Sequence, residues 1–279
     1  MGAAVYFKRL ARYLIKGIPV NNVSVNVVTQ NASNRLQGQG VLITGGGKGL
    51  GYYIAKKCIE EGANVIISGR NEDVLKNATK QLGEQCRYIV FDVKDVNGDA
   101  DMIDEAESII GVPLTCLVSN AGVSLHEGNF RNVTSDGWDT QLNTNLKGNY
   151  FLVKSFIEHL EKRNEKKGNI LVVTSERAMR PDDIPYGLTK VASNNFIKAM
   201  SVKVIKEGIR INGIAPGVTA TDMTGFSKDG NLFNSWQNNE RIFIPEEVAE
   251  VAAFLLSDVS ACISGEIIAC DQGNYISVW

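Results

Sequence analysis

The features that the sequence lacks argue against several classes of protein. No apolar stretch approaches the roughly 20 residues that a membrane-spanning helix needs, and those at the start of the chain are too short and interrupted for a signal peptide. The five cysteines are widely spaced, with no Cys-x-x-Cys pair and no cluster with histidine, which argues against a disulfide framework or a metal site. A net charge of −2 suggests no nucleic-acid partner. We therefore expect a cytoplasmic, metal-free protein that binds no nucleic acid.

Acidic residues are also missing from the first part of the chain. The first is Glu60, and eight lysines and arginines precede it: Lys8, Arg9, Arg12, Lys16, Arg35, Lys48, Lys56 and Lys57. Apolar residues at helical spacing predict a short basic amphipathic helix over residues 3–16. We expect it to pack on the body or on a neighbouring subunit, and attachment to a membrane surface is the alternative. With an edge strand favoured by the alternation over 23–27, it forms an N-terminal extension, residues 1–37.

From residue 39 onward, short β-branched runs alternate with longer helical patterns. The expected strands are 41–44, 64–68, 88–91, 114–119, 169–174, 210–215 and 266–269, and the expected helices are 49–61, 71–82, 98–110, 134–162, 186–207 and 245–257. This alternation is typical of βαβ units, and the apolar strands indicate a sheet buried on both faces. The sequence thus predicts an α/β fold, a Rossmann-type doubly wound parallel sheet of about seven strands, as a single catalytic domain over 38–279. We expect residues 222–243 to form a helical lid over its pocket.

A glycine-rich turn joins the first expected strand to the first expected helix. It reads Thr44, Gly45, Gly46, Gly47, Lys48, Gly49, Leu50 and Gly51. Such a turn lets backbone N–H groups approach a pyrophosphate at a helix N-terminus. The spacing fits T-G-x-x-x-G-x-G, whereas the longer dinucleotide fingerprint fails at Leu50 and no Gly-Lys-Ser/Thr closes a P-loop.

The end of the second expected strand bears on which dinucleotide binds. Enzymes that use NAD place a carboxylate there on the ribose 2′-hydroxyl, but this chain reads Ser68-Gly69-Arg70. A 2′-phosphate suits a guanidinium at Arg70 and the ammonium of Lys48. We therefore expect NADP(H) to be preferred over NAD(H), the alternative being that both are ordinary surface cations.

The candidate catalytic pair is Tyr186 and Lys190, which lie four residues apart on one helix face. A nearby ammonium lowers the pKa of a phenol, and we expect that effect here, making Tyr186 a proton donor to a carbonyl oxygen or an acceptor in the reverse reaction. Three other tyrosines have a lysine at the same spacing. Only Tyr186 follows the end of a strand by a short loop, at the edge of a parallel sheet where ligands bind.

Other polar residues are expected at the same edge. Ser175 follows the fifth strand and is expected to hold the substrate oxygen against Tyr186. The run Asn120-Ala121-Gly122 closes the fourth strand with small residues and leaves room for a ribose and nicotinamide. Asn145 is a polar residue in an otherwise apolar helical pattern, for which a local backbone-bonding or solvent-facing role is the alternative.

At this point the sequence resembles the short-chain dehydrogenase/reductase family over about residues 38–274. The resemblance rests on motifs in the family's order: Thr44-Gly45-x-x-x-Gly49-x-Gly51, Asp92-Val93, Asn120-Ala121-Gly122, Asn145, Ser175, Tyr186-x-x-x-Lys190 and Pro216-Gly217. It implies a catalytic tetrad of Asn145, Ser175, Tyr186 and Lys190, in which Asn145 holds a water connected to Lys190. It also implies that the cofactor meets Asp92 and Val93 at the adenine, Asn120 and Lys190 at the ribose hydroxyls, and Pro216, Gly217, Thr219 and Thr221 at the nicotinamide end.

The likeness is strongest to the 3-oxoacyl-[acyl-carrier-protein] reductase branch, which grades into sugar and polyol dehydrogenases. One departure is a shortened loop, because Ser175 lies 11 residues before Tyr186. If the shortening displaces Ser175, Thr174 is the alternative hydroxyl. The loop also carries charges at Glu176 and Arg177, where small residues are common.

These observations predict an NADP(H)-dependent oxidoreductase that interconverts a carbonyl and a secondary alcohol on a small, polar molecule such as a sugar, a polyol or a keto-acyl group. The resemblance implies a homodimer or homotetramer. A 3-oxoacyl-[acyl-carrier-protein] reductase is the alternative within the class, and a non-catalytic nucleotide-binding scaffold is the alternative outside it.

Overall fold

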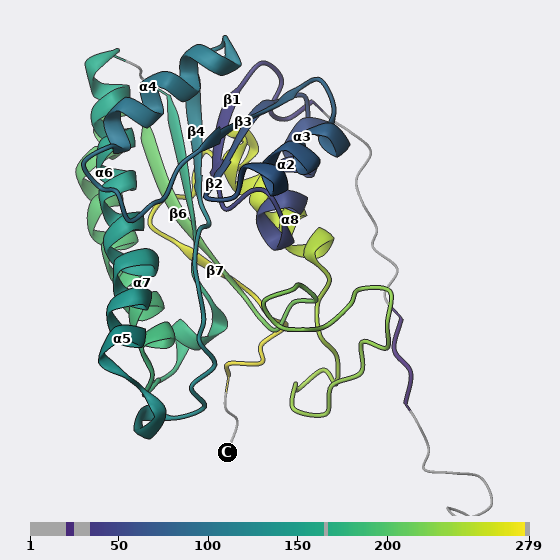
Figure 1. Ribbon diagram of the computed structural model, residues 1–279. Coiled ribbons are helices and arrows are strands. Elements are labelled where there is room, and N and C mark those ends of the chain that lie inside the picture. The colour runs from purple at the N-terminus through teal and green to yellow at the C-terminus, as the bar shows by residue number, and fades with distance from the viewer. Residues whose placement is uncertain (1–20, 25–33, 165–166, 277–279) are drawn as a thin grey trace, which may run out of the picture.

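The computed structural model describes residues 21–24, 34–164 and 167–276. In these ranges, seven parallel strands form one sheet in the order β3-β2-β1-β4-β5-β6-β7 (Figure 1). The strands are β1 (Gly40–Thr44), β2 (Asn64–Gly69), β3 (Cys86–Val90), β4 (Leu114–Ser119), β5 (Gly168–Val173), β6 (Ile209–Pro216) and β7 (Ile267–Cys270). The order reverses direction between β1 and β4, and ligands of open α/β sheets bind at the carboxyl edge beside such a point.

Helices cover both faces of the sheet, as Figure 1 shows. One face carries α2 (Gly49–Glu60), α3 (Glu72–Leu82) and α8 (Pro245–Leu256), and the other carries α4 (Asp99–Ile110), α6 (Asn149–Lys162) and α7 (Pro185–Val204). The two cores follow from strand alternation: Val41 and Ile43 pack with the first group of helices, while Leu42 packs with the second. The prediction of a Rossmann-type doubly wound sheet is therefore confirmed.

The single helix expected over 134–162 is interrupted. The chain instead forms α5 (Ser135–Gln141), a π-helix η2 (Leu142–Gly148) and then α6. The extra residue per turn in a π-helix rotates the side chains that follow, and such segments occur frequently at functional sites. Asn145 lies in the middle of this segment.

The expected helical lid is wrong in its secondary structure. Residues 222–243 contain no helix, and form turns with isolated bridges that pair Thr219 with Phe243 and Phe233 with Arg241. Of the aromatic side chains in this segment, Phe226 is 42% exposed and Trp236 is 90% exposed. The expected N-terminal helix lies outside the described residues, as does most of the expected strand over 23–27. Val23 and Ser24 are described and are not in a strand.

A buried arginine ties β6 to the end of α8. The Arg210 guanidinium donates to the carbonyl oxygens of four residues: Leu255, Ser257, Ser260 and Ile263, at 2.8–3.1 Å. Carbonyl groups at a helix C-terminus have no intrahelical donor, and a cation there satisfies them. Arg210 thereby fixes β6, whose carboxyl end contributes to the site below.

Of the helices in the described ranges, none is long and apolar enough to cross a membrane. The same residues contain no group of three or more histidine, cysteine and acidic side chains placed to hold a metal ion.

Candidate active site

The glycine turn lies between β1 and α2 at the carboxyl edge of the sheet. Gly45 and Gly49 have φ angles of +65° and +56°, which favour glycine. A Cβ on Gly51 would lie 2.5 Å from both the Gly45 carbonyl oxygen and the Asn120 Nδ2, so glycine is required there as well. The turn leads into a 12-residue helix whose first N–H groups have no intrahelical acceptor. A phosphate or pyrophosphate fits this site.

Asn120 fastens the end of β4 to the glycine turn. Its Nδ2 donates to the carbonyl oxygens of Thr44 at 2.9 Å and Gly45 at 3.3 Å, and the Thr44 hydroxyl oxygen accepts from the backbone N–H groups of Asn120 and Ala121 at 3.1 Å. In this structure the Asn120 amide holds the turn in shape. The resemblance implies a contact of Asn120 with the ribose, and its donors are already engaged with the backbone.

The two cations expected at a 2′-phosphate lie in different settings. Arg70 is exposed directly after β2. Lys48 precedes α2 and pairs with Asp222 of the 222–243 loop at 3.3 Å, both side chains being largely exposed. A cavity of about 650 Å³ opens here between the glycine turn, α2, α3 and residues 220–229.

The residues expected at the adenine follow β3. Val93 is buried, while Asp92 is half-buried and its Oδ1 accepts from the backbone N–H of Lys94 at 3.0 Å. The carbonyl oxygen of Val93 lies so close to Gly148 that any side chain at that glycine would overlap it. Gly148 therefore lets the π-helix approach this loop.

Asn145 is fully buried in the π-helix, and its side-chain amide bonds both backbone polar groups of Val123, in the loop that follows β4. Its Oδ1 accepts from the Val123 N–H and its Nδ2 donates to the Val123 carbonyl oxygen, both at 2.8 Å. The side chain therefore bonds the backbone of a loop 22 residues earlier, so neither a local backbone bond within the helix nor a solvent-facing position, the alternatives considered, describes it. The main-chain carbonyl oxygen of Asn145 accepts from Asn149 at 2.8 Å.

Sequence reasoning missed Asn149. Its Nδ2 also donates to the Ala121 carbonyl oxygen at 3.1 Å, and its Oδ1 accepts from the Ser119 hydroxyl at 2.9 Å. It therefore joins the end of β4 to the π-helix. The signal available in the sequence was a second asparagine four residues after Asn145, on the same helix face.

The shortened loop does not displace Ser175. Ser175 is buried beside Tyr186, and its hydroxyl acts to lower the pKa of that phenol. Thr174 is excluded as the alternative hydroxyl, because it points into the sheet and donates to the Ile214 carbonyl oxygen of β6 at 3.0 Å. The helix α7 begins at Pro185, which places Tyr186 in its first turn beside Ser175.

Lys190 is 3% exposed and lies beneath the tyrosine. Its Nζ donates to the Val173 carbonyl oxygen at 2.8 Å and lies 5.7 Å from the centroid of the Tyr186 ring. The Lys190 Nζ and the Asn145 Oδ1 both lie within 4 Å of the position that a Cβ on Gly122 would take. The structure therefore brings the four expected tetrad residues to one place at the carboxyl edge.

The expected pKa of Tyr186 is wrong in direction. Burial raises the pKa of Tyr186 above its ordinary value, and this outweighs the Ser175 hydrogen bond and the positive charge of Arg177, which lower it. Burial also lowers the pKa of Lys190 to about 8. The sequence pattern shows that a cation is near, but it contains no measure of how deeply the pair is buried.

The expected nicotinamide end follows β6. The Gly217 N–H donates to the Cys270 carbonyl oxygen at 3.0 Å, and the Thr219 hydroxyl donates back to the Gly217 carbonyl oxygen at 2.9 Å. Thr221 faces the glycine turn, since its Cβ lies 3.8 Å from where a Cβ on Gly49 would be. Residues 217–221 thus connect β6 to the opposite side of the candidate phosphate site.

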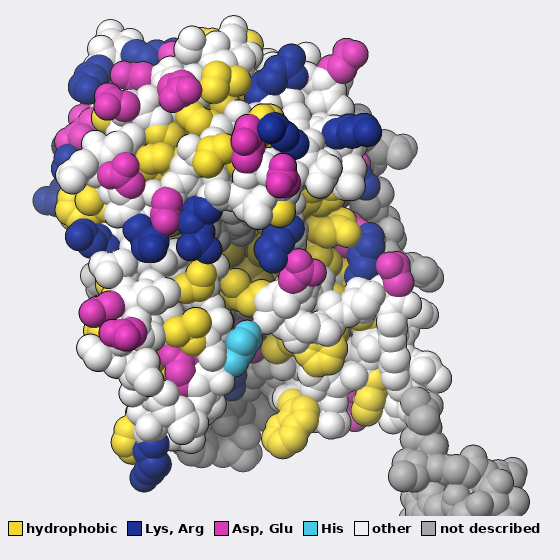
Figure 2. All heavy atoms as spheres, viewed as in Figure 1, with side chains coloured by type: hydrophobic (Ala, Val, Ile, Leu, Met, Phe, Trp, Pro, Cys, Tyr) yellow, Lys and Arg dark blue, Asp and Glu magenta, His cyan; other side chains and the backbone are white. Residues whose placement is uncertain are grey.

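The charges of the 176–183 loop are paired within the protein. Arg177 pairs with Asp182, Arg180 lies 3.9 Å from Glu176, and Asp183 accepts from the backbone N–H of Phe130 at 2.9 Å. Figure 2 shows charges of both signs intermixed on one face of the molecule, around a recess with hydrophobic side chains at its margin. The charged loop therefore gives no separate indication of an anionic substrate.

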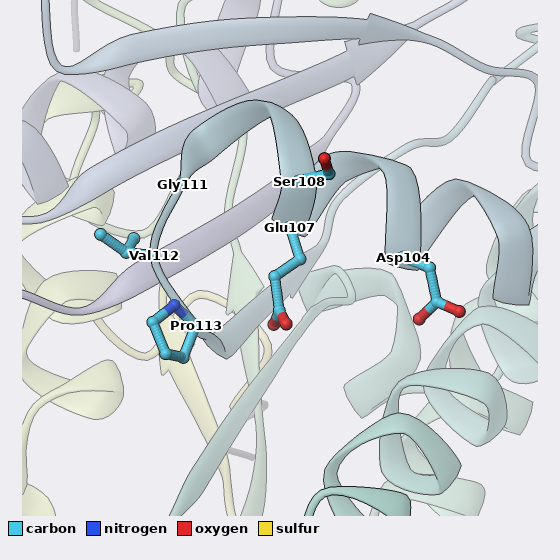
Figure 3. A pocket seen from close by; sticks show the side chains of 6 residues that line it. All are labelled: Asp104, Glu107, Ser108, Gly111, Val112 and Pro113. Carbon is cyan, nitrogen blue, oxygen red and sulfur yellow. The ribbon is translucent and has the colours of Figure 1, made fainter.

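The two histidines differ in their surroundings. His126 is exposed. His159 is 8% exposed, with its ring nitrogens 3.0 Å from Asp104 and 3.1 Å from Glu107. Figure 3 shows the pocket beside it, of about 450 Å³, which Asp104 and Glu107 line together with residues 108 and 111–113. These residues precede β4, at the edge of the sheet opposite to the tetrad.

Comparison with known proteins gives matches over most of the chain. The family model described as enoyl-(acyl carrier protein) reductase matches residues 45–274. A 3-oxoacyl-[acyl-carrier-protein] reductase of Chlamydia trachomatis is 32% identical over 249 residues, covering 86% of this chain and 99% of the relative. The gluconate 5-dehydrogenase of Gluconobacter oxydans is 32% identical over 251 residues, covering 87% of this chain and 97% of the relative.

Solved structures agree with these matches. A 3-ketoacyl-(acyl-carrier-protein) reductase of Brucella melitensis, solved with NADH, has a TM-score of 0.79 and 27% identity, covering 86% of this chain and 100% of that one. A short-chain type dehydrogenase/reductase of Mycobacterium ulcerans has a TM-score of 0.78 and 27% identity, covering 86% and 90%. The family model, the relatives and the solved structures, together with the sheet order and the glycine turn, show that this chain is an oxidoreductase of the short-chain dehydrogenase/reductase family.

Proposed function

We propose that the protein is an NADP(H)-dependent oxidoreductase that interconverts a carbonyl and a secondary alcohol, with Tyr186 as the general acid and base. The observation that carries this proposal is the buried Lys190 ammonium 5.7 Å from the centroid of the Tyr186 ring, with Ser175 buried beside it, at the carboxyl edge of the sheet. The same edge carries the glycine turn that fits a pyrophosphate.

A bound nicotinamide nucleotide supplies or accepts the hydride at the substrate carbon. Tyr186 donates its phenolic proton to the carbonyl oxygen during reduction and accepts it from the alcohol during oxidation. A raised pKa keeps Tyr186 protonated at neutral pH, which is the state that reduction requires. The Ser175 hydroxyl holds the substrate oxygen against the phenol, and Asn145 fixes the β4 loop through Val123.

The proposed preference for NADP(H) rests on the end of β2. The strand finishes at Gly69 and the next residue is Arg70, so the position that carries a carboxylate in NAD enzymes holds no acid. Lys48 lies on the neighbouring turn, and binding of a 2′-phosphate by Lys48 requires release of its ion pair with Asp222. The proposed adenine contacts are Asp92 and Val93.

We propose a small, polar substrate of the sugar, polyol or keto-acyl kind. The similarity to a 3-oxoacyl-[acyl-carrier-protein] reductase and to a gluconate 5-dehydrogenase, both at 32% identity, supports a reaction at a carbonyl and favours neither substrate over the other. Residues 222–243 lie beside the candidate site, and their role as a lid is part of the proposal.

The test is a cofactor-oxidation screen. Acetoacetyl thioesters and keto sugars are presented with NADPH and with NADH in parallel, and absorbance at the dihydronicotinamide band is followed. We expect turnover of at least one carbonyl with a preference for NADPH. A preference for NADH would contradict the cofactor assignment, and no turnover across the panel would count against the substrate class.

We further propose a homodimer or homotetramer, which light scattering of the full chain would test. A monomer would contradict it. Co-sedimentation with liposomes, with and without residues 3–16, tests whether that segment attaches to a membrane surface.

A further inference from the structure

The shortened loop between Ser175 and Tyr186 contains a closed ion pair. Arg177 lies in the 3₁₀ turn η3 (Glu176–Met179), and its Nε and Nη2 both donate to the Asp182 carboxylate, the Nη2–Oδ1 distance being 2.8 Å. The Asp182 side chain is 2% exposed and that of Arg177 is 38% exposed. A two-point guanidinium–carboxylate contact of this kind fixes both distance and orientation.

Asp182 also fixes the start of α7. Its Oδ1 accepts from the Ile184 N–H at 3.1 Å, one residue before the helix begins. Its carboxyl group packs against the α-carbon of Gly187 so closely that any Cβ there would overlap it. Asp182 is therefore in contact with residues on both sides of Tyr186, and its position sets where that side chain leaves the helix.

Arg177 is connected to the same site through Ser175. The backbone N–H of Arg177 donates to the Ser175 Oγ at 3.3 Å, and the Ser175 hydroxyl in turn lowers the pKa of Tyr186. The Arg177 charge lowers the pKa of Tyr186, whereas the Asp182 and Glu176 charges raise it. The Lys190 ammonium, below the ring, donates to the Val173 carbonyl oxygen.

We propose that Arg177, held by Asp182, is a positioning residue for Tyr186: its backbone N–H orients Ser175, and its guanidinium places a positive charge beside the phenol. This inference rests on the proposed role of Tyr186 as acid and base. It assigns a function to the charged residues that replace small ones in this loop, and it explains why the loop charges pair with one another.

The charged groups that face Tyr186 come from three elements. Lys190 lies on α7 itself, Glu176 and Arg177 lie on η3, and Asp182 lies in the connecting loop. Glu176 is 4% exposed and its Oε2 accepts from Asn274 at 2.9 Å, so its position is fixed as well. Loss of the Arg177 charge leaves the Asp182 carboxylate without its ion-pair partner, next to the phenol.

The test measures the pH dependence of alcohol oxidation, which requires Tyr186 to be deprotonated. The substrates are NADP⁺ with 3-hydroxybutyryl thioester or with a polyol, between pH 6 and pH 10.5. We expect Arg177→Gln to move the rising limb of kcat to higher pH by about half to one unit, a value reduced for the partial exposure of Arg177. Arg177→Lys keeps the positive charge, so its pH profile should lie close to that of the wild type. Arg180→Gln, directly after η3, should leave the profile unchanged, because the Arg180 side chain is 50% exposed and forms no ion pair with Asp182.

A purely structural role gives a different result. It lowers kcat of Arg177→Gln by the same factor at every pH, with no movement of the limb, and this outcome would overturn the inference. Asp182→Asn removes a negative charge and should move the limb to lower pH; if that variant does not fold, the Arg177 pair decides alone. The Tyr186→Phe variant separates the two proposals. If Tyr186→Phe is active, the proposed role of Tyr186 is refuted. If Tyr186→Phe is inactive and the pH profile of Arg177→Gln does not move, only the proposed role of Arg177 is refuted.

Discussion

Asp99→Asn should change how the stability of this protein depends on pH. Asp99 is the first residue of α4 and is 0% exposed, and neither of its carboxylate oxygens has a hydrogen-bond partner among the described residues. Met102 and Ile103, one turn further on, belong to the apolar core under the sheet. Burial, together with the nearby Asp95 charge, raises the pKa of Asp99 from 3.8 to about 7.

The size of the effect follows from linkage. The folded state holds a proton on Asp99 between pH 4 and pH 7 that the unfolded chain has released, so stability falls as the pH rises through this interval and is constant above it. Each pH unit in this interval corresponds to about 1.4 kcal/mol, so the titration of Asp99 should lower the free energy of unfolding by about 3 kcal/mol between pH 5 and pH 8.5. Asparagine has the shape of the aspartic acid side chain but does not titrate. The free energy of unfolding of Asp99→Asn, relative to that of the wild type, should therefore increase by about 3 kcal/mol between pH 5 and pH 8.5.

The assay is urea unfolding followed by circular dichroism, at a fixed protein concentration and ionic strength, at pH 5 and pH 8.5. Asp101→Asn is the matched control, because Asp101 lies exposed in the same helical turn and should change stability by less than about 0.5 kcal/mol at either pH. If the difference between Asp99→Asn and the wild type is the same at both values of pH, the raised pKa of Asp99 is wrong.

Three further predictions concern the cofactor turn, the cofactor preference and the fold. Gly51→Ala should weaken NADPH binding at least tenfold in a fluorescence titration, because the new Cβ would overlap the Gly45 carbonyl oxygen. Gly69→Ala is the control and should bind NADPH normally, because its Cβ would make only a 3.5 Å contact. Equal binding by both variants would refute the steric argument. Arg70→Ala should raise KM for NADPH by about tenfold and leave KM for NADH unchanged, and a parallel change in both would remove the 2′-phosphate assignment. Arg210→Met should lower the free energy of unfolding by about 3 kcal/mol in urea titrations, because four carbonyl oxygens lose a buried charged donor, and a loss below about 1 kcal/mol would contradict this.

The sheet could be predicted from sequence because its strands are continuous apolar runs with turn residues at both ends. The interruption of the long helix at Leu142–Gly148 could not, because the periods of an α-helix and a π-helix differ too little to separate within seven residues. The 222–243 segment misled the prediction because its aromatic residues suggested a helix face. The chain there has Gly225 and Gly230, leaves Trp236 exposed, and buries Leu232 and Ile242 from turns and isolated bridges instead of a helix.

Ser175, Tyr186 and Lys190 were predictable because parallel strands end at one edge and each was identified by its place after a strand or on a helix face, whereas the place of Asn145 in the tetrad came from the family resemblance. Their partners were not predictable. The Asn149 bridge and the contact of Asp182 with Gly187 depend on which side chains meet across the fold. The pKa of Tyr186 depends on depth of burial, and that is a property of the folded chain alone.

The central claim is that Tyr186 transfers the proton at a site where the nucleotide binds independently of it. The most direct measurement compares wild type and Tyr186→Phe for NADPH affinity by fluorescence titration and for turnover of the best carbonyl in the screen. We expect Kd for NADPH to change less than twofold and kcat to fall by at least a thousandfold. Turnover by Tyr186→Phe comparable with that of the wild type would contradict the assignment of Tyr186 as the acid and base.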